Sequence, residues 1–329
     1  MRSVRTDNKN NRELAARSRA LRYRVLWATL IAVLILTLHF FRPVQGGLWF
    51  QVFFDSLHVP VFGMIAVAVF MITGTRKTWR LRQRLLVTAV SVFVISILSE
   101  AAQIPGPRDA SFEDLVADWL GATGFVLLAL ALHARRHNGR SASRVYALAG
   151  SAVLLVALSD LALTSAAFLE RNARVPILVT FDSYLGQRFV RTQNAVLERV
   201  SDGTGNNRRA KIRLGNGAWP GVIFHDIWPN WSSYSTLLFE LEAIGDEPLE
   251  INIRVHDQAH KSGSQPHSDR FNSRLKLQPA PLTFRIPLDT VVNAPRTRKM
   301  DLTRIDGIII FGSRDAQGGQ FWLSEIRLE

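Results

Sequence analysis

The residues best suited to chemistry form three closely spaced pairs at the ends of long apolar runs. Members of a pair lie three or four positions apart and would share one helix face; they are Asp55 and His58, Glu100 and Gln103, and Asp114 and Asp118, with Arg108 and Ser111 just before the last pair. An imidazole beside a carboxylate can act as an oriented base, and the two together can hold a divalent metal. Ionisable side chains are costly inside a membrane, which points to a function. We expect these residues to form one membrane polar cluster.

Helix capping explains only part of this pattern. An aspartate at the start of a helix is favoured by capping and by the helix dipole, which accounts for Asp55 and Asp114. Glu100, close to the end of its run, opposes the dipole, and Asp118 lies one turn inside its run. Asp160, in the fifth run, is similarly placed but has no evident partner in the sequence.

The elements that would position these residues are membrane-spanning helices. A helix needs about 20 apolar residues to cross about 30 Å of hydrocarbon. Five runs approach this length and predict an α-helical bundle of five spans, at about 24–41, 57–74, 85–103, 114–133 and 145–168. No convincing cleavage site follows the first run, which we therefore interpret as a retained span.

The distribution of charge predicts the orientation of these spans. The formal net charge is +13, but residues 1–24, 75–84 and 134–144 together carry +15 and the rest of the chain −2. Basic residues that flank alternate apolar runs set orientation by the positive-inside rule and argue against nucleic acid as a partner. We expect a protein of the bacterial cytoplasmic membrane, with its N-terminus in the cytoplasm and everything after Phe168 outside.

The spaced polar residues also resemble a known family. DSLHVPVFG and SEAAQIPGPRDASFEDLVADWLGATGF are similar to the VanZ-like family of bacterial membrane proteins, over roughly residues 24–135. The matching positions are Asp55, His58, Glu100, Gln103, Arg108, Ser111, Asp114, Asp118, Gly121 and Gly124. The resemblance implies a role in the cell envelope and an influence on susceptibility to teicoplanin-type glycopeptides. Gly121 and Gly124 would let membrane helices approach closely.

The sequence changes character after about residue 177. Short alternating runs separated by Gly, Pro, Asn and Asp predict an all-β antiparallel sandwich. WPGVIFHDIWPNWSSYSTLLFELEA and LEINIRVHD resemble galactose-binding-like jelly rolls of carbohydrate-binding modules, in which sugars stack on exposed aromatic rings. The glycan-binding candidates are Trp219, Trp228, Trp231, His256, His260, Arg270 and Asn272. Burial in the core is the alternative for each Trp.

The resemblance to jelly rolls also implies a structural calcium, with Asp182 and Glu325 as candidate ligands. Two carboxylates are too few for an ion that takes 6–8 oxygens. The chain has no cysteine, which excludes disulfides and thiolate metal sites.

We divide the chain into a basic cytoplasmic segment (1–23), a VanZ-like four-helix domain (24–135), a fifth helix with linker (136–170) and an extracytoplasmic β-sandwich (171–329).

Three function classes remain open. The sequence favours a non-catalytic envelope protein that binds membrane lipids, an anionic lipid or a lipid-linked precursor through the polar cluster, and an envelope polysaccharide through the β domain. The second class is a membrane enzyme that uses the same cluster for acid–base or metal-assisted chemistry on an envelope lipid. A transporter ranks last, because five spans without an inverted repeat are unlike that architecture.

Overall fold

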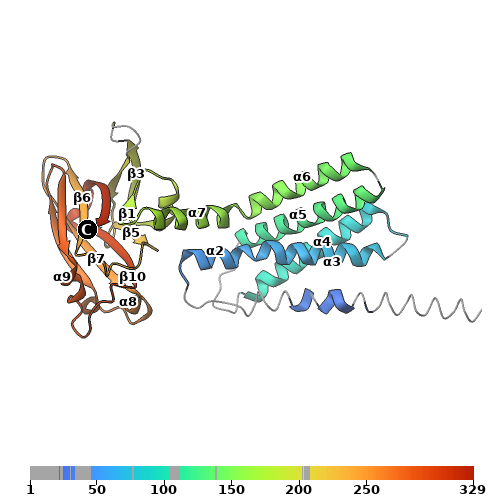
Figure 1. The fold of residues 1–329 in the computed structure, drawn as a ribbon, viewed down its shortest axis with the longest axis horizontal. Helices are drawn as coiled ribbons and strands as arrows, with labels where there is room; N and C mark the ends of the chain where they lie inside the picture. The colour runs from blue at the N-terminus through green and yellow to red at the C-terminus, as the bar shows by residue number, and fades with distance from the viewer. Residues whose placement is uncertain are drawn as a thin grey trace, which may run out of the picture. The chain divides into compact units, whose positions relative to one another are not determined.

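The structure, a computed structural model, contains two units, residues 1–162 and 163–329, which we describe separately (Figure 1). It describes residues 22, 25–29, 31–33, 46–75, 78–103, 112–137, 139–201, 203 and 208–329. Most of the first predicted span, 24–41, therefore lies outside the described residues, as do Arg108 and Ser111.

The first unit is helical. Its helices are α2 (Leu48–Ser56), α3 (His58–Gly74), α4 (Leu81–Gln103), α5 (Phe112–His137) and α6 (Arg140–Ala157). In the described part of the chain, three segments are long and apolar enough to cross a membrane, namely Leu48–Gly74, Leu81–Ala101 and Phe112–Arg136. Large apolar side chains such as Leu86, Leu98 and Leu132 are exposed on these segments. Such surfaces suit a lipid environment better than water.

The fifth predicted span, 145–168, is divided in the structure. α6 ends at Ala157, α7 (Ser159–Ala173) follows after Leu158, and the two helices are bent by 54°. The Ser159 hydroxyl donates to the carbonyl of Val156 at 2.7 Å, a local bond that competes with the helix and favours a bend. Counting this pair as one span raises the number among the described residues to four, so five spans are not confirmed.

Two glycines on α5 set the helix spacing. A Cβ at Gly121 would lie 2.2 Å from the carbonyl oxygen of Val59 on α3. A Cβ at Gly124 would meet the Leu154 side chain of α6 at 2.6 Å. The α3–α5 approach therefore requires glycine at 121, in agreement with the close helix contacts expected from small residues.

The second unit is an antiparallel β-sandwich. One sheet has the strand order β3-β4-β11-β6-β9, with β1 also paired to β11, and the other has the order β2-β5-β10-β7-β8. The strands are β1 (Ile177–Thr180), β2 (Val190–Gln193), β3 (Ala195–Ser201), β4 (Arg208–Leu214), β5 (Gly221–His225), β6 (Thr236–Ile244), β7 (Leu249–Asp257), β8 (Phe271–Leu277), β9 (Leu282–Pro287), β10 (Ile305–Gly312) and β11 (Gln320–Leu328). Short helices connect them: η1 (Leu185–Phe189), α8 (Gln258–Ser262), η2 (His267–Asp269), α9 (Leu288–Val292) and η3 (Arg314–Ala316).

The strand order identifies a jelly roll. If the eight strands β4 to β11 are counted 1 to 8, the sheets run 1-8-3-6 and 2-7-4-5. This is the order of two interlocked Greek keys, with the chain crossing between the sheets. The predicted sandwich is confirmed, and β1, β2 and β3 extend its two sheets.

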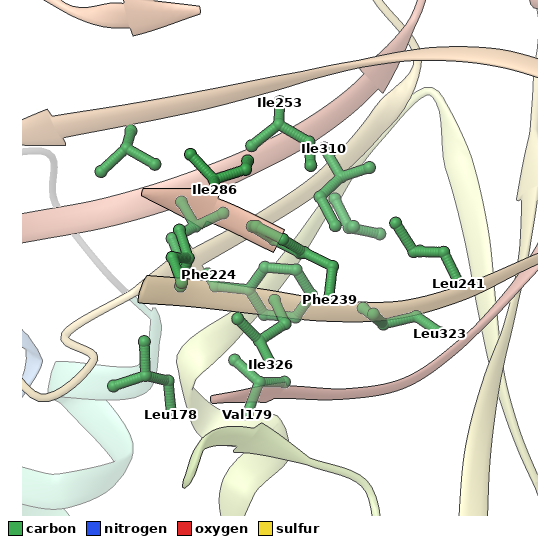
Figure 2. Close-up of a cluster of buried hydrophobic side chains, with 14 of the residues drawn as sticks. Leu178, Val179, Phe224, Phe239, Leu241, Ile253, Ile286, Ile310, Leu323 and Ile326 are labelled. Atoms are coloured by element: carbon green, nitrogen blue, oxygen red, sulfur yellow. The ribbon is translucent and has the colours of Figure 1, made fainter. Parts of the chain in front are cut away.

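The core lies between the two sheets. Alternate residues of each strand point inward, and Figure 2 shows Phe224, Ile253 and Ile310 of one sheet packed with Phe239 and Ile326 of the other. At the start of this unit, Arg188 Nη1 donates to Thr164 Oγ1 of α7 at 2.8 Å. Most of α7, from Leu163 on, therefore belongs to the second compact unit.

Candidate functional site

Four polar side chains from three helices meet in the interior of the helical unit; we call them the polar centre. His58 begins α3, Ser96 and Glu100 lie on α4, and Asp118 lies on α5. His58 Nδ1 is 2.8 Å from Asp118 Oδ1, and Ser96 Oγ donates to Asp118 Oδ2 at 2.5 Å. All four side chains are buried, Glu100 with 5% and the others with 0% exposed surface.

The polar centre has the composition of a metal or acid–base site. One ligand atom each of His58, Glu100 and Asp118 lies within 4.8 Å of the other two. The His58 ring is parallel to the Phe62 ring at 6.2 Å, so apolar packing also holds the imidazole. A carboxylate that binds one ring nitrogen fixes the tautomer and orientation of a histidine.

Of the residues predicted to form the membrane polar cluster, His58, Glu100 and Asp118 lie together in the structure. Asp114 is also buried, one turn before Asp118 on α5. Asp55 and His58 do not share a helix, because α2 ends at Ser56 and a break at Leu57 separates α2 from α3. The Asp55 side chain is exposed. Gln103 ends α4, but its side chain lies outside the described part. Asp160 is exposed at the start of α7.

Sequence reasoning missed Ser96. The signal was available, because Ser96 precedes Glu100 by four positions and therefore shares its helix face. A serine inside an apolar run has no charge to draw attention to it.

An apolar cavity of about 540 Å³ lies in the same unit, and none of the four polar-centre residues lines it. It runs between α4 and α5 from Trp119 to Leu130, with Ala66 of α3 in its wall. Trp119 follows Asp118 directly, and its ring stacks on Phe93 with centroids 5.6 Å apart. A polar site and an apolar cavity thus share α4 and α5.

In the β unit, the outer surface of the sheet β2-β5-β10-β7-β8 collects planar and apolar side chains; we call it the five-strand face. Because Val222, Ile253, Val255, Ile308 and Ile310 are buried, their strand neighbours point outward. The face comprises Arg191, Ile223, Asn252, Arg254, Asn272, Arg274, Ile309 and Phe311. Ile309 is paired with Ile223 on one side and Arg254 on the other, and Arg254 is paired with Asn272.

Trp219 extends the five-strand face. It precedes β5 with a φ of 54°, 59% of its surface is exposed, and its ring meets Phe311 edge to face with centroids 5.7 Å apart. Non-glycine residues with positive φ are uncommon and often mark functional positions. The exposed ring and its fixed backbone make Trp219 available for stacking.

The other two tryptophans are differently placed. Trp231 is wrong as a ligand contact, because its ring is fully buried in the core and its Nε1 donates to the carbonyl of Trp228 at 2.7 Å. Trp228 is half-buried against the core, and its Nε1 donates to the carbonyl of Asn230 at 2.9 Å.

The histidine candidates are mostly internal. His260 is fully buried, with Nε2 2.9 Å from Arg254 Nη2 and Nδ1 3.3 Å from Asp269. His256 is buried, with Nε2 3.3 Å from Asp306. Neither ring offers a surface for a sugar.

Arg270 and Asn272 are half-buried beside these histidines. Arg270 Nε donates to Asn272 Oδ1 at 3.1 Å. Asn272 belongs to the five-strand face, and Arg270 lies directly before β8 at its edge.

An arginine clamp stabilises the loops beside this face. Arg298 Nη2 donates to Asp257 at 2.7 Å, and Arg298 Nε donates to Asp269 at 2.6 Å. Burial raises the pKa of the Asp257 carboxyl, but the bonds from Arg298 and from two backbone N–H groups outweigh it, so the pKa is lowered. The pKa of Asp269 is lowered chiefly by Arg298.

Burial also affects the basic groups of this region. It lowers the pKa of His260, with Arg254 as the next cause. Burial, together with nearby Arg270, lowers the pKa of Arg254 to about 10. His260 therefore favours its neutral form, with Nε2 facing Arg254 and Nδ1 facing Asp269.

The two predicted calcium ligands are engaged by protein donors. Asp182 accepts from the backbone N–H of Arg208 at 2.9 Å and from Thr180 Oγ1 at 3.0 Å. Glu325 pairs with Arg327 at 2.9 Å. Neither belongs to a group of three His, Asp or Glu ligands within the described residues.

Comparisons with solved structures find matches of low identity and with TM-scores below 0.5. A family 11 carbohydrate-binding module from Clostridium thermocellum, in complex with a β-1,3-1,4-mixed-linked tetrasaccharide, is 15% identical with a TM-score of 0.39, and the match covers 46% of this chain and 94% of that one. The family 11 module of the cellulosomal cellulase Lic26A-Cel5E of the same organism is 15% identical with a TM-score of 0.32, covering 42% and 85%. An exo-β-agarase is 14% identical with a TM-score of 0.38, covering 46% and 24%.

No model of a known protein family and no curated protein sequence matches the chain. The similarity of residues 24–135 to the VanZ-like family therefore rests on the sequence pattern alone. The jelly-roll assignment rests on the strand order of the β unit.

Proposed function

We propose that this chain is an integral protein of the bacterial cytoplasmic membrane whose jelly roll binds a saccharide chain on the five-strand face. Three apolar segments with exposed apolar side chains and the basic segments beside the apolar runs support membrane insertion. Counting the first apolar run and the bent α6–α7 pair as spans gives an odd number of crossings, which would put the β unit outside the cytoplasm. A reporter fused after Glu329 that is active only in the cytoplasm would refute this orientation.

The single observation that carries the saccharide proposal is the exposed Trp219 ring braced edge to face on Phe311. Pyranose rings present C–H groups that stack on aromatic faces, while their hydroxyls need planar donors and acceptors. Asn252 lies opposite Phe311 on the neighbouring strand, and Arg254 lies opposite Asn272 on the next pair. An apolar ring at one end and amide and guanidinium groups beside it therefore form one elongated surface.

The positive charge of this face narrows the ligand class. Arg191, Arg254, Arg270 and Arg274 all lie on or beside it, and of these Arg274 is paired with Glu250 at 3.1 Å. Guanidinium groups bind carboxylate and phosphate in a bidentate manner. We therefore infer a preference for acidic saccharides, such as a uronate-containing or phosphate-containing envelope polysaccharide, over neutral glucans.

The test compares two tryptophans on opposite sides of the sandwich. Trp322 on β11 lies between the buried Phe321 and Leu323, so it faces outward from the other sheet, with Arg209 4.7 Å from its ring. With the full chain in lipid nanodiscs, Trp219→Ala should weaken retention on an acidic polysaccharide by about 10-fold or more, as expected for an aromatic hot spot. Trp322→Ala should leave retention unchanged. Equal retention of both variants and the parent chain would contradict the proposal.

A second candidate function concerns the helical unit. Asp118 of the polar centre and Trp119 of the cavity wall are consecutive residues of α5, which suits an amphiphile whose polar head reaches the centre while its chain lies in the cavity. An envelope lipid or lipid-linked precursor has this form, and the oriented imidazole also permits acid–base chemistry on it.

Mass spectrometry of co-purified lipids tests this second function. Val126→Phe would fill the cavity, whereas Val90→Phe changes an exposed position on α4. Loss of one lipid class in the first variant only supports the site. Identical lipid profiles of both variants and the parent chain would exclude it.

A further inference from the structure

We infer that His58, Glu100 and Asp118 bind one divalent transition-metal ion in the interior of the helical unit. This site lies in a different unit from the five-strand face and does not depend on saccharide binding. It combines one imidazole and two carboxylates, one residue from each of α3, α4 and α5.

The spacing of the ligand atoms fits a single ion. Bonds from Zn²⁺ to histidine nitrogen and carboxylate oxygen are about 2.0–2.2 Å, so two ligands of one ion lie at most about 4.4 Å apart. The ligand atoms of the three residues lie within 4.8 Å of one another. His58 Nδ1 and Asp118 Oδ1 are hydrogen-bonded at 2.8 Å, so metal binding would displace the proton that they share and part the two atoms to about 3.3 Å, the distance between two ligands of a tetrahedral ion. Closure of the set around one tetrahedral ion therefore requires side-chain movements of up to about 1.5 Å.

Neighbouring groups hold these ligands in place. Ser96 Oγ donates to Asp118 Oδ2, which directs the other carboxylate oxygen toward His58. The Phe62 ring supports the imidazole face, and Gly121 permits the close approach of α5 to α3. Metal ligands are commonly oriented by such outer hydrogen bonds, and ligands borne on helices are positioned more accurately than ligands on loops.

Charge and ligand type select the class of ion. Carboxylates within an apolar bundle are costly, and a divalent cation with a neutral imidazole offsets both negative charges of Glu100 and Asp118. Imidazole favours Zn²⁺, Fe²⁺ and related ions, whereas Mg²⁺ and Ca²⁺ prefer oxygen ligands alone. We therefore expect Zn²⁺ to bind more tightly than Mg²⁺ or Ca²⁺.

The competing account is a cluster held together by protein groups alone, with the Arg108 guanidinium as the compensating charge. The two accounts differ in a measurable way, because the protein takes up metal only if the metal site exists. The full chain, purified in nanodiscs without chelator, should contain about one equivalent of transition metal by elemental analysis, as a closed site of this kind retains its ion. Chelation should lower its melting temperature, and Zn²⁺ should restore it.

Variants locate the ion. Glu100→Gln should weaken Zn²⁺ binding by about 10-fold or more, the size of effect that even outer-shell changes produce. Glu113→Gln, at an exposed position on α5, is the matched control and should bind as the parent chain does.

Cobalt substitution tests the site without any variant, since Co²⁺ bound by nitrogen and oxygen ligands gives visible d–d absorption bands. Absence of these bands, no transition metal above background and no Zn²⁺-dependent melting shift would overturn the metal site. Saccharide retention should persist after chelation. A failure of the metal proposal is therefore distinguishable from a failure of the proposed saccharide binding.

Discussion

Gly121→Ala should disrupt the helical unit by forcing α3 and α5 apart. The new Cβ would lie 2.2 Å from the Val59 carbonyl oxygen, whereas ordinary contact begins at 3.4 Å, so the helices must separate by about 1.2 Å. His58 is next to Val59, and Asp118 lies three positions before Gly121. The 2.8 Å contact between His58 and Asp118 would then lengthen to about 4 Å, beyond hydrogen-bond range. Overpacking costs about 1–3 kcal/mol and the lost buried hydrogen bond a similar amount, together about 2–6 kcal/mol.

Gly124→Ala on the same helix is the matched control. Its Cβ would meet Leu154 Cδ2 and Cγ at 2.6 Å and the Gly150 carbonyl oxygen only at 3.4 Å. Leu154 can change rotamer without moving a backbone, so we expect a cost of about 1–2 kcal/mol, below that of Gly121→Ala. Thermal unfolding of both variants in the same detergent provides the comparison. If Gly121→Ala is no less stable than Gly124→Ala, the close α3–α5 contact is not what positions the polar centre.

Further predictions concern the β unit. Arg298→Ala leaves the buried Asp257 carboxylate without its clamp and should cost about 2–4 kcal/mol, less than a fully buried pair because Arg298 is partly exposed; denaturant unfolding measures it. Trp231→Ala should cost about 3–5 kcal/mol by the same assay and should weaken saccharide retention only as far as it unfolds the protein. Because the pKa of His260 is lowered from 6.5, the unfolded chain binds more protons than the folded one below pH 6.5. Stability should therefore fall on acidification from pH 6.5, and fall again near pH 4 as Asp257 and Asp269, whose pKa values are lowered, take up protons. Melting curves between pH 8 and pH 3 test this order, and a flat profile down to pH 4 would contradict the part assigned to His260.

The sequence predicted the class of each unit because that information is local. Apolar runs of span length mark α3, α4 and α5, and period-two alternation marks the strands of the sandwich. The jelly-roll order itself comes from the long-range pairing of strands such as β4 with β11, which alternation does not encode. The break at Leu158 was missed because hydropathy is continuous across it and only the Ser159 hydroxyl marks the bend.

In the candidate sites too, local spacing predicted some residues, whereas the position of others depends on the tertiary fold. The spacing of three and four positions predicted that His58, Glu100 and Asp118 share helix faces with other polar residues, and this inference needs only the helix period. In the structure these three residues lie together. For the tryptophans, no periodicity distinguishes Trp219 from Trp231. Trp231 lies in an irregular segment whose backbone N–H bonds to the Leu302 carbonyl, and only the tertiary fold turns its ring into the core.

The central claim, that a saccharide binds on the five-strand face through Trp219, can be tested at one resonance. The chain has eight tryptophans, so fluorotryptophan labelling gives a ¹⁹F spectrum simple enough to assign by substitution. On titration of the full chain with the acidic oligosaccharide that it retains, the Trp219 resonance should shift in a saturable manner while those of Trp322 and Trp231 stay in place. Saturable binding that shifts Trp322 and leaves Trp219 unchanged would contradict the account.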